Sequence, residues 1–314
     1  MRRMTHDTMS DSYTPLDEAF APGASRSAAL SEAITKAASR QAYYTIRVLV
    51  DRDRKRDAYR AYAYFRWIDD QLDEQVTLPA ERHAFVARQQ ALVEARYRGL
   101  DWDGMAQEEW MLADLIASDR EENSGLRSYI RNMMAVMTFD AHRRGRLITE
   151  GELNEYTRCL AAAVTDALHY FIGHERTPPS SEARYLPATA AHITHMLRDT
   201  CEDVAAGYYN VPCELLRSSG ITAGDVASVP YREWVRNRVL LARSYFVAGA
   251  RYLNQVTSLR CRLAGFAYMA RFVGMLDAIE RDNYRLRPAY PEFKRAGYGL
   301  RVGAGVCAHA LWGL

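Results

Sequence analysis

The placement of proline and glycine constrains the fold of this chain more than any other feature of its sequence. Neither residue occurs at positions 24–78, and proline is also absent from positions 80–177 and 231–287. These stretches are rich in Ala, Arg, Leu and Glu, which are strong helix formers. A protein built from sheets would instead need turn residues about every 8 to 12 positions. The sequence therefore predicts an all-α protein.

The helical stretches are long enough to build one large domain. We expect a flexible N-terminal tail at residues 1–24 and a single helical domain at residues 25–314. Loops are expected at residues 178–179 and 211–230, where prolines interrupt the helical pattern. The predicted helices span residues 27–49, 54–73, 79–97, 110–116, 126–144, 149–171, 181–206, 231–256 and 260–284.

Composition and charge exclude several classes of protein. Apolar residues make up 48% of the chain and charged residues 25%, which is typical of a globular protein with a substantial core. The net charge is only +2, and Lys and Arg are scattered among acidic residues, so nucleic-acid binding is not expected. No run of about 18 apolar residues occurs, so we expect no transmembrane helix.

Cysteine usage and the first residues of the chain bear on its location. The five cysteines are odd in number and contain no CxxC pair, so neither a disulfide framework nor a structural zinc site is expected. The basic start of the chain is followed by polar and acidic residues, where a signal peptide needs an apolar run. We therefore expect a cytoplasmic protein, either a monomer or a homodimer.

The first motif that carries chemistry lies within the predicted helix 54–73. At about 100° per residue, Arg66, Asp69 and Asp73 lie on one face of this helix, with Tyr62 one turn earlier. Apolar residues such as Ile68 fill intervening positions. The pattern predicts a deeply packed helix that presents two carboxylates in one direction.

A second motif repeats this arrangement within the predicted helix 181–206. His192, His195, Asp199 and Asp203 follow one another at steps of three and four residues and form a single stripe. Apolar residues such as Leu197 again fill intervening positions. A lone acidic cluster on a helix is usually a solvated face, but two such motifs, each with a neighbouring arginine, favour a shared function.

Stacked carboxylates repel one another, and burying them is costly unless a cation compensates. Mg²⁺ takes oxygen ligands and is usually bound through one or two carboxylates together with substrate phosphate. Two facing carboxylate pairs can therefore clamp a diphosphate through Mg²⁺, which stabilises a departing anion. Arg66 and Arg198 are placed to add bidentate contacts to phosphate oxygens.

At these residues the sequence resembles the squalene/phytoene synthase family. The resemblance rests on Arg-Trp-Ile-Asp-Asp-Gln-Leu-Asp at residues 66–73, on Leu-Arg-Asp-Thr-Cys-Glu-Asp at residues 197–203, and on residues 268–286. It implies an isoprenoid-synthase fold, which is a helical bundle around a central apolar cavity, and an enzyme that uses Mg²⁺. It also implies that the metal-binding carboxylates are Asp69, Asp73, Asp199 and Asp203.

The chain also departs from the family pattern. Members that join two prenyl diphosphates usually carry Gln and Asn at the positions of His192 and His195. They continue after the second motif with Gly-Arg-x-Tyr-x-Pro, whereas this chain has Tyr208 in place of that arginine. An early Ser-x-Ser-Phe element is replaced by a segment that contains Tyr43 and Tyr44. These changes remove cationic and amide groups from the diphosphate end and add aromatic and imidazole groups.

The departures favour a branch of the family that prenylates aromatic acceptors, including carbazoles, in secondary metabolism. Aromatic side chains stack on such acceptors and stabilise an allylic cation. The predicted partners are therefore a prenyl diphosphate donor and an aromatic small-molecule acceptor. The candidate substrate-binding residues are Tyr43, Tyr44, Tyr62, Tyr156, His192, Tyr208 and Tyr209.

In the expected mechanism, the four motif aspartates hold Mg²⁺, and Arg66 and Arg198 draw off pyrophosphate. Asp70 and Glu202 complete the metal-binding set by orienting metal-bound water or the arginines. His195 or His192 removes the proton from the acceptor ring, because imidazole transfers protons near neutral pH. Pyrophosphate is a rival base.

Three alternatives stay open at this point. Within the family, the chain can instead condense two prenyl diphosphates head to head to a squalene-like or phytoene-like product. Outside it, His192, His195 and Asp199 can form the site of a metallohydrolase that uses a transition metal. A catalytically inactive scaffold fits poorly, because all four motif aspartates are intact.

Overall fold

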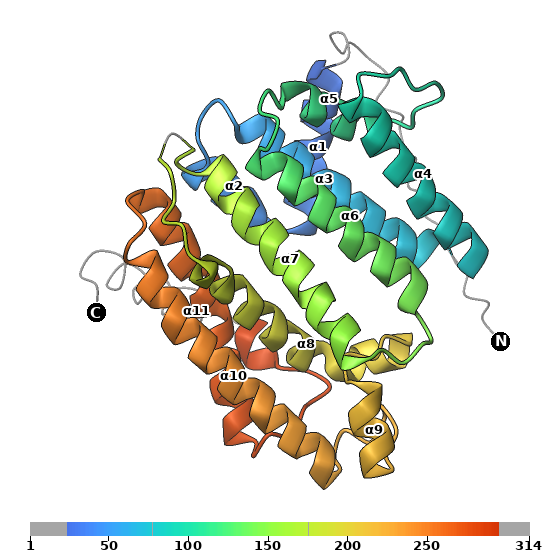
Figure 1. Ribbon diagram of the computed structural model, residues 1–314, viewed down its shortest axis with the longest axis vertical. Coiled ribbons are helices and arrows are strands. Elements are labelled where there is room, and N and C mark those ends of the chain that lie inside the picture. The colour runs from blue at the N-terminus through green and yellow to red at the C-terminus, as the bar shows by residue number, and fades with distance from the viewer. Residues whose placement is uncertain (1–23, 77, 175, 295–314) are drawn as a thin grey trace, which may run out of the picture.

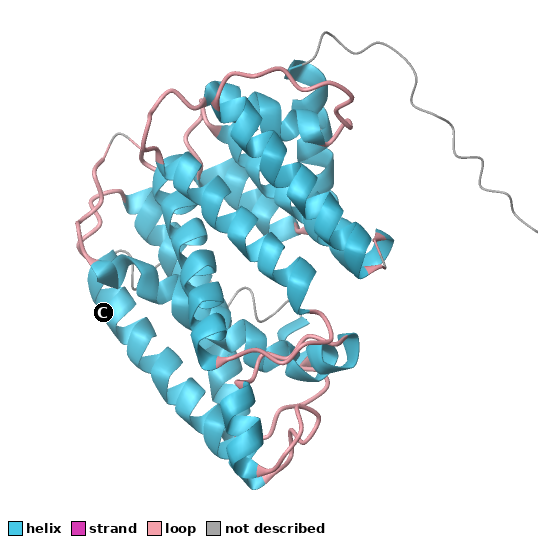
Figure 2. Cartoon of the chain, turned by 45° about the vertical axis from the view of Figure 1, so that its right-hand side comes forward, coloured by secondary structure: helices cyan, strands magenta, loops and turns pink. Residues whose placement is uncertain are grey.

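The structure is a computed structural model that describes residues 24–76, 78–174 and 176–294. Within these residues the chain forms helices that pack into a bundle, without a β-strand (Figures 1 and 2). The predicted all-α class is confirmed. The helices are α1 (Ala24–Ala38), α2 (Arg40–Leu49), α3 (Lys55–Asp70), α4 (Pro79–Tyr97), α5 (Glu109–Ser118), α6 (Gly125–Arg143), α7 (Glu150–Phe171), α8 (Leu186–Ala206), α9 (Cys213–Ser219), α10 (Val229–Leu253) and α11 (Leu259–Arg281).

Short helical turns of other kinds complete these elements. A π-helical turn, η1 (Gln71–Gln75), extends α3, and two 3₁₀ turns, η2 (Glu182–Tyr185) and η3 (Pro291–Lys294), precede α8 and follow α11. The predicted N-terminal tail lies outside the described residues, except for Ala24 in α1. The last part of the predicted domain, residues 295–314, also lies outside them.

Two predicted boundaries are wrong. The predicted helix 27–49 is divided at Ser39, which has a φ of −150° and accepts a hydrogen bond at its Oγ from the backbone N–H of Ala42 at 3.1 Å. A serine that caps a new helix offers the backbone an alternative to continuing the previous one. The predicted loop 211–230 contains α9, which begins after Pro212 and ends at Gly220 with a φ of +63°. Both residues are typical boundaries of a helix.

The two motif helices, α3 and α8, lie inside the bundle. Helix α3 is covered by α1, α5 and α6, and α8 by α7, α10 and α11. Their apolar positions are buried, as Ile68 of α3 and Leu197 of α8 illustrate. Gly249 allows α10 to approach α8 closely, because a Cβ atom at this position would lie 2.6 Å from Cγ of Pro187. The predicted deep packing of both motif helices is confirmed.

The loop that follows α8 is held in place by the connection between α6 and α7. Helix α8 ends at Gly207, whose φ of +86° favours glycine. The carbonyl of Gly207 accepts a hydrogen bond from Gly145 at 2.7 Å, and the N–H of Cys213 donates to Ile148 at 2.8 Å. These bonds fix the short segment 208–212 beside the ends of α6 and α8.

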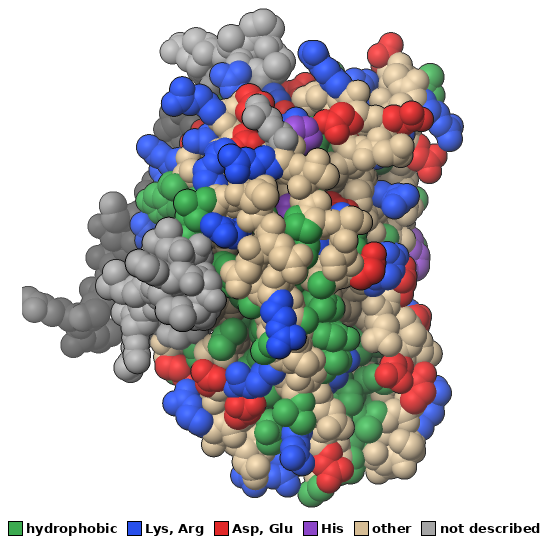
Figure 3. Space-filling view, turned by 60° about the vertical axis from the view of Figure 1, so that its left-hand side comes forward, with side chains coloured by type: hydrophobic (Ala, Val, Ile, Leu, Met, Phe, Trp, Pro, Cys, Tyr) green, Lys and Arg blue, Asp and Glu red, His purple; other side chains and the backbone are tan. Residues whose placement is uncertain are grey.

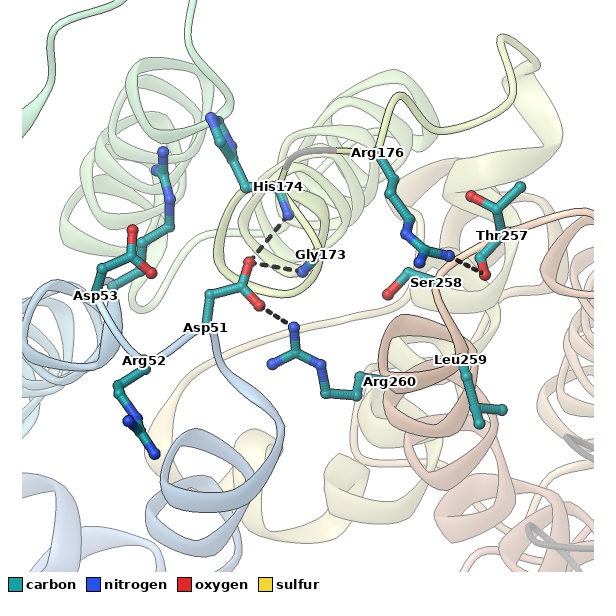
Figure 4. A pocket seen from close by; sticks show the side chains of 11 residues that line it. Asp51, Arg52, Asp53, Gly173, His174, Arg176, Thr257, Ser258, Leu259 and Arg260 are labelled. Carbon is teal, nitrogen blue, oxygen red and sulfur yellow. Dashed lines mark hydrogen bonds and ion pairs between the residues drawn. The ribbon is translucent and has the colours of Figure 1, made fainter.

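At the opposite end of the bundle, Asp51 joins three interhelical connections (Figure 4). Its Oδ2 atom accepts hydrogen bonds from the backbone N–H groups of Gly173 at 2.9 Å and His174 at 3.1 Å. Its Oδ1 atom forms an ion pair with Arg260 at the start of α11. A pocket of about 710 Å³ lies beside this cluster. Asp51 thus links the α2–α3 connection to the chain after α7 and to α11.

Replacing Asp51 with Ala is expected to lower the free energy of unfolding by about 2–4 kcal/mol, because two backbone N–H groups and Arg260 lose a charged partner. Asp53 is the matched control, since it is exposed in the same pocket and forms no hydrogen bond or ion pair with the described part of the chain. Asp53→Ala should change the free energy by less than about 0.5 kcal/mol. Urea unfolding of both variants measures the difference, and equal stabilities would contradict the role of Asp51.

The described residues also show the character of the surface and of the cysteines. On the face shown in Figure 3, basic and acidic side chains are interspersed, with apolar side chains between them. Across residues 24–294, apart from the two gaps, no helix combines the length and apolar character that crossing a bilayer requires. The four cysteines in this part of the chain are free thiols.

Candidate active site

The first motif lies where α3 ends. Arg66 donates from Nη1 to Oδ2 of Asp69 at 3.2 Å, and its Nη2 pairs with Asp70. Asp73 lies in the π-helical turn η1, where the backbone N–H of Val76 bonds to the carbonyl of Gln71 at 2.9 Å. The sequence predicts that Asp73 follows Asp69 by one regular α-helical turn. Because of the π-helical turn, it does not. Such π-helical turns within helices frequently occur at functional sites.

The second motif lies in about the last four turns of α8. Arg198 donates from Nε and Nη2 to the two carboxylate oxygens of Asp199, each at 2.6 Å. Nε2 of His195 lies 2.9 Å from Oδ2 of the same carboxylate. One turn later, Asp203 accepts a hydrogen bond at Oδ2 from Nδ2 of Asn210 at 2.7 Å. Bidentate contact with an arginine fixes the orientation of Asp199.

Both motifs face one cavity of about 240 Å³. The hydroxyl of Tyr208, in the loop after α8, donates to Oδ1 of Asp73 at 3.3 Å and so connects the two sides. This volume is at the small end for ligand pockets, so it suits the diphosphate group of a substrate better than a whole prenyl chain. The predicted apolar cavity stays a prediction. The cavity is lined by Asp69, Leu72, Asp73, Asp140, Arg143, Tyr156, His192, His195, Met196, Asp199, Asp203, Tyr208 and Asn210.

The cavity makes negative charge on two of its carboxylates unfavourable. Burial raises the pKa of Asp69 to about 6, and the neighbouring carboxylate of Asp73 adds to this effect. Burial also raises the pKa of Asp203 to about 6, with a further contribution from Asp199. Burial opposes ionisation of Asp199 as well, but hydrogen bonds from Arg198 and His195 outweigh it and hold the pKa of Asp199 well below its usual range. A bound cation would remove the cost at Asp69 and Asp203.

The chemistry of these side chains fits Mg²⁺ if substrate phosphate and water supply its other ligands. In the part of the chain that the structure describes, no three His, Cys, Asp or Glu side chains are grouped closely enough to hold a metal ion by themselves. Mg²⁺ is commonly held by only one or two carboxylates, and substrate phosphates and waters supply its other ligands. The carboxylate pairs on α3–η1 and on α8 fit that arrangement, since each offers two acidic side chains to the same cavity.

A comparison with known protein families decides the family. The model of the squalene/phytoene synthase family matches residues 35–296. The chain belongs to this family. At the level of sequence, no curated protein matches the chain.

Solved structures of squalene/phytoene synthase type share the fold. A dehydrosqualene synthase in complex with a ligand is 16% identical to this chain, with a TM-score of 0.70, and the match covers 91% of this chain and 97% of that one. The squalene synthase HpnC from Alicyclobacillus acidocaldarius is 18% identical, with a TM-score of 0.65, and the match covers 84% of this chain and 97% of that one. The expected isoprenoid-synthase fold is confirmed.

Several predicted site residues of this family member are not among those that line the cavity. Arg66 and Asp70 pair with each other, and Arg198 pairs with Asp199. Glu202 is exposed on α8. The arginines therefore contact the motif carboxylates, where the sequence predicts contacts with phosphate.

Four of the predicted substrate-binding tyrosines also lie outside the cavity lining. Tyr43 is buried against Tyr59, with ring centroids 5.7 Å apart, and Tyr44 is 56% exposed. Tyr59 precedes Asp69 by ten residues, which is about 15 Å along a helix. Tyr62 and Tyr209 are partly buried against the core. Their predicted contact with substrate stays a prediction.

His192, by contrast, lines the cavity and is buried, with 5% of its surface exposed. Neither of its ring nitrogens has a hydrogen-bond partner within the described residues. Burial lowers the pKa of His192 to about 3, and the nearby His195 and Arg143 lower it further. The imidazole is therefore neutral and a weak base, and both of its nitrogens are enclosed by protein.

Three polar cavity residues are absent from the sequence prediction: Asp140, Arg143 and Asn210. Asp140 and Arg143 occupy the last turn of α6, where the basic run that follows has the pattern of a solvated helix end. Asn210 follows α8 in a loop. Only the spacing of three residues between Asp140 and Arg143, which suits an ion pair on a helix, could have drawn attention to them.

Proposed function

We propose that this protein ionises an allylic prenyl diphosphate between α3 and α8 and joins its prenyl group to a second prenyl diphosphate. The observation that carries the proposal is that Asp69, Asp73, Asp199 and Asp203 line one cavity. The squalene/phytoene synthase family consists of prenyl-transferring enzymes that generally use a divalent metal ion. The four free thiols and this chemistry suit a reducing compartment such as the cytoplasm.

The motif aspartates would hold Mg²⁺ from both sides of the cavity. When bound, Mg²⁺ acts as a Lewis acid that neutralises charge on the leaving diphosphate. The arginines of the two motifs bind these acidic side chains. Arg198 keeps Asp199 ionised and oriented, and Arg66 pairs with Asp69 and Asp70. Asn210 orients Asp203 in the same way through its hydrogen bond.

Two aromatic side chains line the cavity in which, under this proposal, positive charge develops on the prenyl group. Tyr156 and Tyr208 both line the cavity, and the hydroxyl of Tyr156 donates to Oδ2 of Asp140 at 3.1 Å. Burial raises the pKa of Tyr156 well above its usual value and that of Tyr208 to about 12, so both rings stay neutral. Neutral aromatic rings stabilise a nearby cation through their π-electrons.

The family favours a second prenyl diphosphate as the acceptor. Both related structures above are named as enzymes that make squalene or dehydrosqualene. Condensation of two prenyl diphosphates therefore agrees with the family model and with the shared fold better than transfer to an aromatic compound does.

Transfer to an aromatic acceptor, such as a carbazole of secondary metabolism, is the second candidate. The observation that favours it is the neutral imidazole of His192, which lines the cavity 5.1 Å from the ring of Tyr156 and adds a second flat ring on which an aromatic compound can stack. Its pKa of about 3 makes His192 unsuitable as the base that removes the ring proton. His195, bonded to Asp199, is the better candidate for that step.

Product analysis separates the two candidates. Purified protein is incubated with Mg²⁺ and farnesyl or geranylgeranyl diphosphate, with and without a carbazole, and the products are identified by mass spectrometry. A C30 or C40 hydrocarbon formed from the diphosphate alone supports condensation. Prenylated carbazole without any such hydrocarbon overturns it.

A His192→Gln variant sharpens the comparison. Glutamine keeps hydrogen-bonding groups, so condensation should change by less than about threefold. Transfer to an aromatic acceptor that stacks on the imidazole should fall by about threefold to tenfold, which corresponds to the loss of one aromatic contact. The ratio of the two products in a mixed incubation measures the effect, and a thermal melt verifies that the variant is folded.

A further inference from the structure

Among the described residues that line the cavity, Arg143 is the only arginine or lysine. It is the last residue of α6 and is buried, with 6% of its surface exposed. We propose that Arg143 binds the diphosphate of the substrate directly, through its terminal nitrogen Nη2. This inference rests on the proposed function and adds a residue to it that lies on neither aspartate motif.

The guanidinium is held rigidly on two of its three nitrogens. Nε donates to Oδ1 of Asp140 at 2.6 Å, and Nη1 donates to Oδ1 of Asn210 at 2.6 Å. Its central carbon lies 4.8 Å from the ring centroid of Tyr156 and 5.0 Å from that of Tyr208. Contacts on three sides fix the plane of the group, so little side-chain entropy is lost when it binds a ligand.

The remaining nitrogen is available to a ligand. Nη2 of Arg143 forms no hydrogen bond with the described part of the chain, and this atom is accessible rather than enclosed by protein. Burial opposes the charge of Arg143, but the carboxylate of Asp140 outweighs it and raises the pKa of the guanidinium. The cavity therefore contains a permanently charged donor that is still able to form a bond.

The arginines of the two motifs are committed elsewhere. Arg66 binds the carboxylates of Asp69 and Asp70, and Arg198 binds Asp199 with two nitrogens. Neither lines the cavity. Position 208, which follows the second motif, holds a tyrosine and contributes no charge. Among the described residues that line this cavity together with five aspartates, Arg143 is the one side chain with a permanent positive charge.

An indirect role must be separated from direct binding. Arg143 contacts Asn210, which donates to Oδ2 of Asp203 at 2.7 Å, so Arg143 also positions that carboxylate. If positioning were its whole contribution, removing Asn210 would have the same consequence as removing Arg143. Direct binding instead requires the charge of Arg143 and depends little on the link to Asp203.

The test measures the affinity of inorganic pyrophosphate by calorimetry, with saturating Mg²⁺, for the wild type and three variants. Arg143→Gln should weaken binding by about tenfold to a hundredfold, since a hydrogen bond to a charged group is lost. Arg143→Lys keeps the charge without the planar fork and should lose an intermediate amount, at least about threefold. Asn210→Ala breaks the link to Asp203 but keeps the charge of Arg143, so its loss should be at least about threefold smaller than that of Arg143→Gln.

The possible outcomes test direct binding by Arg143 and the proposed function separately. Wild-type affinity in Arg143→Gln, or equal losses in Arg143→Gln and Asn210→Ala, overturns direct binding. If Arg143→Gln does not fold, Arg143→Lys gives the answer, and an affinity equal to that of the wild type overturns the inference. A wild-type protein that does not bind pyrophosphate with Mg²⁺ contradicts the proposed function itself, which distinguishes the two failures.

Discussion

Replacing Asp69 with Asn is expected to lower the rate of prenyl diphosphate ionisation by about 10³-fold, which is about 4 kcal/mol of transition-state stabilisation. Asp199→Asn should have an effect of the same size. Both side chains line the cavity, so each substitution removes a charged oxygen ligand and leaves an amide of the same shape. Release of pyrophosphate from the prenyl donor, measured at saturating Mg²⁺, gives the rate directly.

Matched controls come from the acidic neighbours of these residues. Asp70 pairs with Arg66 and Glu202 is exposed, and neither lines the cavity. Asp70→Asn and Glu202→Gln should therefore lower the rate by less than about tenfold. Losses in the controls as large as those in Asp69→Asn would mean that the whole acidic segment acts through its charge, and that the cavity geometry does not select the metal ligands.

Removing divalent metal with a chelator is expected to abolish turnover, by about 10³-fold or more, and to lower the melting temperature at pH 7.5. The thermal effect follows from the cavity, because without a cation Asp69 and Asp203 face other carboxylates at close range. Adding back Mg²⁺ should restore both rate and melting temperature. Ca²⁺ is a suitable control, since it binds oxygen ligands but accepts longer distances and less regular geometry.

The stabilisation by Mg²⁺ should depend on pH in a defined direction. The pKa values of Asp69 and Asp203 are raised to about 6 in the metal-free fold, above the value of about 3.9 for an unfolded chain. Their contribution to metal-free stability is therefore fully present below about pH 4 and is lost as the pH rises through about 6. Mg²⁺ competes with these protons, so its thermal shift should be larger at pH 7.5 than at pH 5.5. An equal shift at both pH values would exclude Asp69 and Asp203 as ligands.

The sequence predicted the helices well where local signals agree. Helix α4 begins and ends as expected, since Pro79 favours a helix start, and α7 begins after Thr149, which forms a capping box with Glu152. The prediction was wrong at Ser39, because a serine within a helical pattern can either continue a helix or cap a new one. It was also wrong for α9, a short helix whose sequence has no long periodic pattern.

Part of the candidate site could likewise be predicted from the sequence, and part of it could not. The aspartate motifs are local, since their spacing along a helix is enough to place two carboxylates in one direction, and the structure brings both pairs to one cavity. Asp140, Arg143 and Asn210 come from two other segments, and nothing in their immediate sequence marks them. Tyr43 and Tyr44 were assigned to substrate from sequence, but α2 packs on the part of α3 that lies far from Asp69.

The sequence by itself thus determined the helical class, the family and the two aspartate faces, because helix formation and its periodicity depend on residues within a few positions of one another. Only the tertiary structure decided which side chains share the cavity, which arginine is left with an open nitrogen, and which carboxylates carry a raised pKa. These properties depend on burial and on contacts between segments distant in the chain, and local spacing does not encode them.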